Sequence, residues 1–264
     1  MRLSAKQLFP PLLLVLISAA ACNLLRKSEP KSGLELLLQI ETTAADRDRL
    51  VEQTIRTLER RADALGANVN LQRKDSDKII LRIGTTPDME RLKKVLLDYA
   101  RMEFHAVVSP PWPSPVQTYP SIDEAKAAVT AGEEILPYSE RSYLFEQGDR
   151  KAYVIVKAEP VIANEDVRDA QAVPSDGSYQ ITFSLKRDGA RRLGEWTAAN
   201  INNYLGVVLN KELKSIPYIR GQITDQGTIS GAFTRQAAED LALNLRAGSL
   251  PAPVNVLEEK AFGK

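Results

Sequence analysis

Apolar and polar residues follow strand and helix spacings in turn over positions 33–108. An apolar run at 34–40 predicts a strand, and an apolar stripe at 51–65, spaced by three and four residues, predicts an amphipathic helix. A hairpin at 69–83, a second helix and a strand at 102–108 follow. The order βαββαβ is typical of an antiparallel ferredoxin-like sheet with two helices on one face. We therefore expect a ferredoxin-like domain, the base, at 33–108.

Residues 109–150 interrupt this regular pattern. The segment 109–120 contains five prolines, which exclude a regular helix or a central strand. A short helix at 121–134 and an irregular stretch follow, so we expect a proline-rich hinge and irregular segment over 109–150. The aromatic side chains of this region are Trp112, Tyr119, Tyr138, Tyr143 and Phe145. Either they pack two subdomains together, or they line an exposed apolar groove that binds an extended polypeptide.

The segment 151–260 returns to regular spacings and predicts a second α+β subdomain. Its clearest elements are an alternating strand at 180–185 and a helix at about 188–204. A hairpin is expected around 210–212, and a final strand at 254–257. The predicted fold class is therefore α+β, with a ferredoxin-like βαββαβ base and a second α+β subdomain joined by the hinge.

The N-terminal residues have the order of an export signal. Positive charge comes first, then an apolar run at 12–17 and the small residues 18–21. The apolar run is shorter than the roughly 20 residues that a helix needs to span a bilayer. Cys22 directly follows the small residues, as in the lipobox at which bacterial lipoproteins are cleaved and acylated.

Two outcomes are open for this segment. Ordinary signal-peptidase cleavage at 19–21 is the alternative to lipidation of Cys22. We expect a lipoprotein signal peptide at 1–21, a lipid anchor on Cys22 and a polar tether at 22–32. Several acyl chains on one residue anchor a protein stably. Asn23 is not the aspartate associated with inner-membrane retention, so the sequence also permits a location in the outer membrane.

The charge balance gives no reason to expect a nucleic-acid partner. The whole chain carries 35 basic and 34 acidic residues. Loss of Arg2 and Lys6 with the signal peptide leaves 33 basic residues and a net charge of −1. A nucleic-acid-binding domain carries a basic surface instead.

The chain also offers little material for catalysis. It has one cysteine, Cys22, and one histidine, His105. These counts exclude an internal disulfide, the usual nucleophile–base pairs and most zinc sites. We expect His105 on the surface of its strand, on the face opposite Phe104. The expectation is that the protein is no enzyme and uses no metal and no cofactor.

Short segments of the chain resemble the SecD family of Sec translocon subunits. The segment 245–253, LRAGSLPAP, is similar to the stretch that precedes the second transmembrane helix of SecD. The other similar segments, in the same order as in SecD, are 33–38 (GLELLL), 102–104 (MEF), 164–170 (NEDVRDA), 215–217 (SIP) and 231–234 (GAFT). The resemblance covers roughly residues 33–260. It implies the first periplasmic domain of SecD, with a base at 33–108 and a mobile head at 151–260 that is thought to hold emerging polypeptide.

The chain also departs from the SecD pattern. A lipobox-like signal stands where SecD has a membrane helix, and Asn164 replaces the glycine usual in the head motif. The later membrane helices of SecD, with the acidic residues linked to proton flow, would begin where this chain stops. We therefore expect a stand-alone lipoprotein without the transmembrane motor.

Two hypotheses about function follow. The first is an accessory protein that binds unfolded secretory polypeptides together with components of the Sec translocon. The second is a structural or scaffolding lipoprotein that binds one folded partner. The first predicts broad, weak binding, whereas the second predicts one tight partner. In both, the protein is anchored in the bacterial cell envelope by its lipid and faces the periplasm.

Overall fold

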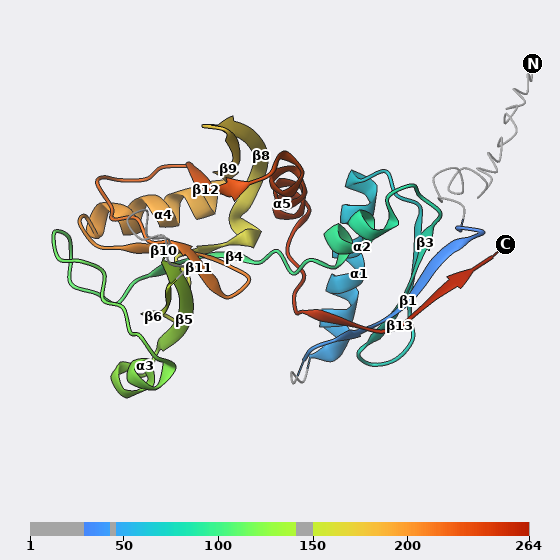
Figure 1. The fold of residues 1–264 in the computed structure, drawn as a ribbon, viewed down its shortest axis with the longest axis horizontal. Coiled ribbons are helices and arrows are strands. Elements are labelled where there is room, and N and C mark those ends of the chain that lie inside the picture. Colours follow the sequence, from blue (N-terminus) through green and yellow to red (C-terminus); the bar gives the residue numbers. More distant parts are fainter. Residues whose placement is uncertain (1–28, 43–45, 141–149, 264) are drawn as a thin grey trace, which may run out of the picture.

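The computed structural model describes residues 29–42, 46–140 and 150–263. Two bodies lie side by side and are joined by short chain segments (Figure 1). We call the body with the four-stranded sheet the base and the other body the head. The fold class is α+β, as the sequence pattern predicts.

The base is one antiparallel sheet covered on one face by two helices. The strand order is β13-β1-β3-β2. Its elements are β1 (Gly33–Ile40), α1 (Arg47–Ala64), β2 (Val69–Arg73), β3 (Lys78–Gly84), α2 (Met89–Leu97) and β13 (Val254–Phe262). Alternation along β1 and β3 directs every second side chain into the core, and these buried residues are Leu36, Leu38, Ile40, Ile79, Leu81 and Ile83.

The fourth strand of the base is not the one that the sequence pattern predicts. The segment 102–108 was expected there, but β4 (Met102–Ala106) pairs with strands of the head. Instead β13 pairs along the whole of β1, from Gly33 opposite Phe262 to Ile40 opposite Val254. The burial of the two strands explains the exchange. β4 is buried on both faces and suits a sheet interior, whereas the exposed, charged β13 suits an edge.

The head is therefore inserted between α2 and the last strand of the base. The expected limits of the two subdomains differ from the structure at these two strands. The segment 254–260 lies in the base sheet and not in the head, and 102–106 lies in the head sheet and not in the base.

The head contains two sheets. The six-stranded sheet has the order β6-β5-β11-β10-β4-β7, and the three-stranded sheet has the order β12-β9-β8. The larger sheet curls until the chain after β4 reaches β6, where the Val108 amide donates to the Ile155 carbonyl at 2.9 Å. Its further strands are β5 (Glu133–Glu140), β6 (Arg150–Lys157), β7 (Ile162–Ala163), β10 (Leu205–Leu209) and β11 (Glu212–Ser215).

The second sheet of the head packs against α5, which lies between this sheet and the helices of the base (Figure 1). The remaining elements are α3 (Ile122–Ala128), the 3-10 turn η2 (Asn164–Asp166), β8 (Val167–Ser175), β9 (Ser178–Leu185), α4 (Arg187–Ala199), β12 (Gln226–Phe233) and α5 (Arg235–Ala247).

Two local expectations have different outcomes in the head. The hairpin around 210–212 is confirmed, because Asn210 and Lys211 adopt φ values of 53° and 63° between β10 and β11. The stretch after α3 was expected to be irregular, but 133–140 forms β5. Its proline and adjacent glutamates hide the alternation, and pairing with β6 along its length compensates for their weak strand preference.

Arg61 of α1 fixes the junction of the two bodies. Two segments cross between base and head, 98–101 and 248–253. The Arg61 guanidinium is fully buried and donates to backbone carbonyls. Around the start of the first crossing it donates to Leu96 at 2.8 Å and to Asp98. In the second crossing it donates to Gly248 at 2.9 Å. Burial lowers the pKa of Arg61 to about 10, so the side chain stays charged at neutral pH. A single cation therefore satisfies backbone acceptors of both crossings.

Candidate functional site

Trp112 has the largest exposed fraction among the large apolar side chains of the described residues, 47%. Its indole stacks on the ring of Tyr218, with 5.1 Å between ring centroids and 19° between the planes. The Trp112 amide donates to the Asn202 carbonyl at 2.8 Å. The backbone therefore fixes the place of the indole although much of its area remains in contact with solvent.

Two further side chains extend this surface. The Arg220 guanidinium lies 4.9 Å from the Tyr218 ring centroid, within the range of a cation–π interaction. Ile201, which precedes Asn202, is 43% exposed. We call Trp112, Ile201, Tyr218 and Arg220 the aromatic surface. It combines apolar rings with a cation, so it can contact apolar and acidic side chains without requiring a particular sequence.

The other predicted aromatic residues have different surroundings. Tyr119 pairs its backbone with Tyr153 of β6 through two hydrogen bonds of 2.8 Å, and its hydroxyl accepts a hydrogen bond from Gln117 at the surface. Tyr138 on β5 is half-buried and packs against the apolar cluster inside the curled sheet, which Tyr218 also contacts. Tyr138 therefore packs within the head, and Tyr119 is held to β6 of the head by its backbone. Tyr143, Phe145 and Cys22 lie outside the described residues.

Sequence reasoning missed Ile201, Tyr218 and Arg220. They are far from Trp112 in the chain, and no motif marks them. Tyr218 comes to stack on Trp112 because the Asn202 amide donates to the Ile219 carbonyl at 2.8 Å, which holds the two segments side by side. Only this tertiary pairing completes the surface.

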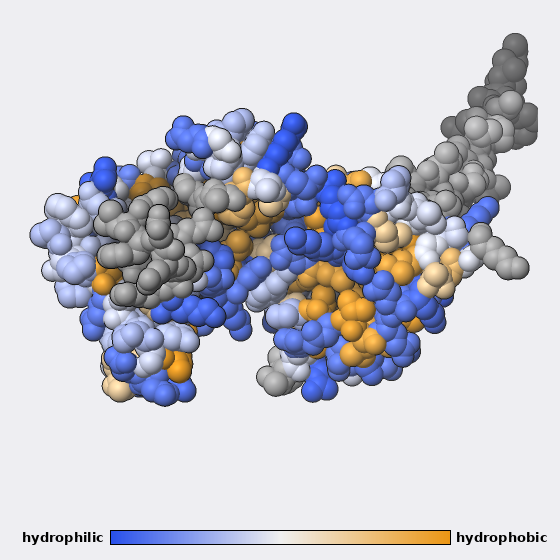
Figure 2. Space-filling model, in the orientation of Figure 1, coloured by the Kyte–Doolittle hydropathy of each residue, from blue (hydrophilic) through white to orange (hydrophobic). Residues whose placement is uncertain are grey.

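The base also exposes apolar side chains. Figure 2 shows apolar residues gathered over the helices of the base and β13. Leu257 and Val256 on β13 are 46% and 42% exposed. The base therefore carries a second apolar surface, at the edge of its sheet, with exposed fractions close to that of Trp112.

His105 is buried, contrary to the expectation of a surface histidine. It is 2% exposed, its Nδ1 lies 2.8 Å from the Lys157 carbonyl, and its Nε2 lies 3.6 Å from Glu103 Oε2. The closure of the sheet by β6 covers the face of β4 that an isolated strand would expose. Burial opposes the charged form of His105, but Glu103 and the Lys157 carbonyl outweigh burial and raise the pKa of His105.

Glu103 completes this buried polar group. Burial would raise the pKa of Glu103, but His105 and Arg101 outweigh it and lower the pKa to about 2. Arg101 Nη2 lies 2.7 Å from Glu103 Oε1. The described residues contain no group of three or more His, Cys, Asp and Glu side chains that could hold a metal ion. The His105–Glu103 pair joins two side chains of β4, and the Lys157 carbonyl of β6 contacts the same imidazole.

The base, the inserted head and the two crossings define a two-body α+β domain with a ferredoxin-like base. Residues 51–109 match the family "Protein translocase subunit SecDF, P1 domain, N-terminal", and residues 138–252 match "SecDF, P1 head subdomain". The chain therefore belongs to the SecD/SecDF family through its P1 domain, as its sequence motifs suggest.

Curated relatives and solved structures agree with this assignment. The chain is 32% identical to the protein translocase subunit SecD of Rhodobacter capsulatus, over 86% of this chain and 38% of that protein. It is 33% identical to SecD of Aquifex aeolicus, over 82% of this chain and 40% of that protein. The chain thus spans about two fifths of the length of these relatives.

The structural matches are "Crystal structure of SecDF in Super-membrane-facing form" and "Structure and function of a membrane component SecDF that enhances protein export". The first has a TM-score of 0.65 and 25% identity and covers 89% of this chain and 31% of that chain. The second has a TM-score of 0.62 and 25% identity and covers 85% of this chain and 98% of that chain. Within the part of the chain that the structure describes, no helix is long and apolar enough to cross a membrane.

Proposed function

We propose that this protein is a membrane-anchored SecD-like accessory that binds exported, unfolded polypeptides in connection with Sec-dependent translocation. The observation that carries the proposal is the exposed Trp112–Tyr218 stack on a domain homologous to the SecDF P1 head. An unfolded chain presents apolar side chains and no fixed shape. An aromatic surface suits it because apolar contact and cation–π attraction tolerate many sequences.

The expected affinity is low. Burial of one apolar side chain contributes about 1.5–3 kcal/mol, and about 4 kcal/mol corresponds to a Kd of about 1 mM. A surface of two rings, one aliphatic side chain and one guanidinium therefore supports binding in the micromolar to millimolar range. Weak binding suits a surface that has to release each segment of a moving chain.

The membrane anchor is the second part of the proposal. Cys22 carries acyl chains after cleavage, and residues 22–32 connect them to the start of β1. Eleven extended residues reach at most about 40 Å. The base therefore stays close to the membrane, with the domain on the periplasmic side. Radiolabelled or clickable palmitate should label the wild type and not Cys22→Ser, and Cys22→Ser should leave the membrane fraction. Equal labelling of both would overturn the anchor.

The polypeptide-binding role is tested by photo-crosslinking in cells. A photo-reactive residue at position 112 reports on the aromatic surface, and the same residue at position 257 is the matched control, because Trp112 and Leu257 are 47% and 46% exposed. The proposal predicts a ladder of many secretory precursors from position 112 and few from position 257. Equal ladders from both positions would mean that exposure alone explains capture, and would contradict a specific surface.

A scaffolding role is the second candidate. It is favoured by the composition of the aromatic surface, since Trp, Tyr and Arg dominate the central residues of interfaces between folded proteins. A single discrete adduct from position 112, in place of a ladder, would support this role and identify the partner.

A further inference from the structure

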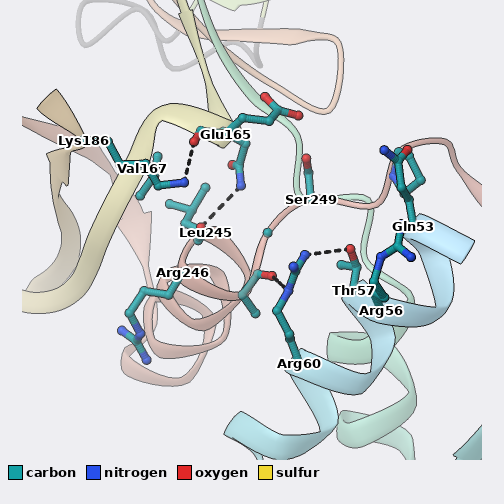
Figure 3. A pocket seen from close by; sticks show the side chains of 14 residues that line it. Gln53, Arg56, Thr57, Arg60, Glu165, Val167, Lys186, Leu245, Arg246 and Ser249 are labelled. Carbon is teal, nitrogen blue, oxygen red and sulfur yellow. Dashed lines mark hydrogen bonds between the residues drawn. The ribbon is translucent and has the colours of Figure 1, made fainter. Parts of the chain in front are cut away.

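A cavity of about 450 Å³ lies between the base and the head. One wall is the face of α1 that points toward the head, and the other wall is formed by the head and the second crossing (Figure 3). The side chains that α1 contributes are Gln53, Arg56, Thr57 and Arg60. Their spacing by three and four residues places all of them on one helical face. The cavity therefore belongs to neither body alone.

Positive charge dominates this cavity. Its charged lining residues are Arg56, Arg60, Glu165, Lys186 and Arg246, which give a net charge of +3. Like charges four residues apart on a helix, as Arg56 and Arg60 are, destabilise it by a few tenths of a kcal/mol. The mature chain as a whole is close to neutral. The charge is therefore local to the cavity, which favours a bound anion.

Three of these cations are placed to contact a ligand. Arg60 donates from Nε to the Ala247 carbonyl at 2.8 Å and from Nη2 to Thr57 at 3.0 Å, which fixes its guanidinium at the wall and leaves Nη1 for a further acceptor. Lys186 Nζ donates to the Glu165 carbonyl at 2.7 Å and keeps two further protons. Arg56 makes one long ion pair, 3.4 Å to Glu52, between two exposed side chains.

Arg246 contributes charge without a direct contact. Figure 3 shows its side chain directed away from α1, and its Nη1 donates to the Ala170 carbonyl. Gly248 permits the close approach of Arg60. It adopts a φ of +102°, and a Cβ there would lie 3.0 Å from Arg60 Nη2. The second crossing is therefore shaped around the Arg60 guanidinium.

We propose that this cavity binds a phosphate-class oxyanion, either free phosphate or the phosphate of a phospholipid headgroup. Arginine forks match the paired oxygens of a phosphate, and a lysine adds a point charge. Free phosphate carries about 1.5–2 negative charges at neutral pH, and the phosphodiester of a phospholipid carries a single one, so either opposes part of the +3 charge of the lining. The bound anion lies in the cavity that Arg56 and Arg60 of the base and Lys186 of the head line together, and its charge opposes the repulsion between these cations across the two bodies.

The test is phosphate titration of the full chain at constant ionic strength, with chloride as the reference anion and calorimetry as the readout. The wild type should bind phosphate, and the double variant Arg56→Gln/Lys186→Gln should bind it at least tenfold more weakly. Arg191→Gln is the matched control, because Arg191 lies 3.4 Å from Glu195, four residues away on a helix, as Arg56 lies 3.4 Å from Glu52. Its phosphate affinity should equal that of the wild type.

Vesicles distinguish the two sources. Liposomes of phosphatidylcholine with or without phosphatidylglycerol, added to Cys22→Ser protein, report on a headgroup, whereas glycerol phosphate in solution reports on a free ligand. Loss of either binding in Arg56→Gln/Lys186→Gln and not in Arg191→Gln supports the site. Phosphate and vesicle binding no stronger than with chloride or neutral lipid would overturn the proposal, as would equal losses in the control.

Discussion

The base and the head each bury a charged side chain, and they stabilise it in different ways. In the base, Arg61 donates to backbone carbonyls, and burial lowers its pKa to about 10. In the head, His105 and Glu103 face each other, and the pKa of His105 is raised while that of Glu103 falls to about 2. A cation held by neutral acceptors keeps its charge at every physiological pH. The pair of Glu103 and His105 loses the carboxylate charge at low pH and the imidazolium charge at high pH. The junction is therefore insensitive to pH, and the head is not.

The largest expected effect comes from the junction. Arg61→Leu leaves the Leu96, Asp98 and Gly248 carbonyls without their donor in a buried site. We expect a loss of about 3 kcal/mol in the free energy of unfolding, measured by urea denaturation at pH 7. Arg56→Leu, an exposed change on the same helix, should stay within about 0.5 kcal/mol of the wild type. Similar losses in both variants would show that the buried guanidinium does not hold the junction.

The next largest effect is expected at Glu103 and tests whether the stability of the head depends on pH more than that of the junction does. The folded-state pKa of Glu103, about 2, lies below the usual value of 4.5, so its contribution is present above pH 4.5 and is lost as the pH falls toward 2. Glu103→Gln should cost about 2 kcal/mol at pH 6 and flatten the loss of stability between pH 4.5 and 2. Glu165→Gln, at a side chain that is 68% exposed, is the control and should leave that curve unchanged.

His105 reports on the same pair from the alkaline side. Its pKa is raised above 6.5, so its contribution is fully present below pH 6.5 and is lost as the pH rises through the folded-state pKa. Because His105 is the only histidine, its NMR titration can be assigned directly. The titration midpoint should fall in Glu103→Gln. An unchanged midpoint would mean that Glu103 does not stabilise the imidazolium.

Two helix caps compare the bodies at a smaller scale. Asp88 caps α2 of the base by accepting from the Arg91 amide, and Thr234 caps α5 of the head by accepting from the Ala237 amide, each at 3.2 Å. Asp88→Ala and Thr234→Ala should each cost about 1 kcal/mol. If both variants lower one shared melting transition, base and head unfold together. If each lowers a different transition in calorimetry, the bodies unfold separately, and Arg61 does not couple them.

The smallest stability effect is expected at the two exposed apolar surfaces. Trp112→Ala and Leu257→Ala remove side chains of nearly equal exposure, 47% and 46%. Each should change the free energy of unfolding by no more than about 1 kcal/mol. Binding of an unfolded, fluorescently labelled reporter should weaken severalfold in Trp112→Ala and remain unchanged in Leu257→Ala. Equal binding by both variants would remove the functional distinction between head and base.

Local spacing predicted most elements, and tertiary pairing decided the rest. The hairpin at 210–212 follows from residues that tolerate positive φ, and the stripe at 51–65 follows from helical spacing. Strand spacing cannot reveal which sheet a strand joins. Both β4 and β13 alternate well enough to complete the base, and only burial on both faces distinguishes β4. The insertion of the head was therefore not predictable from pattern.

The candidate site was predictable in part for a related reason. Trp112 stands out in the sequence because a proline-rich segment cannot bury it in regular structure. Its partner Tyr218 lies against it because two distant chain segments pair through their backbones. A periodic sequence pattern does not predict such pairing. The expectation that His105 lies at the surface was wrong. Its strand face looks exposed in the sequence pattern, but the closure of the sheet against Lys157 covers it.

The pairing of Gly33 with Phe262 and of Ile40 with Val254 also has a mechanical meaning. Tension on the chain before Gly33 and on the second crossing before Val254 pulls β1 and β13 from opposite ends, along their own axes. The hydrogen bonds between the two strands then resist together in shear, and do not open one after another as in a zipper. Force applied between the N-terminal tether and the head therefore acts on the base sheet in its mechanically strong direction.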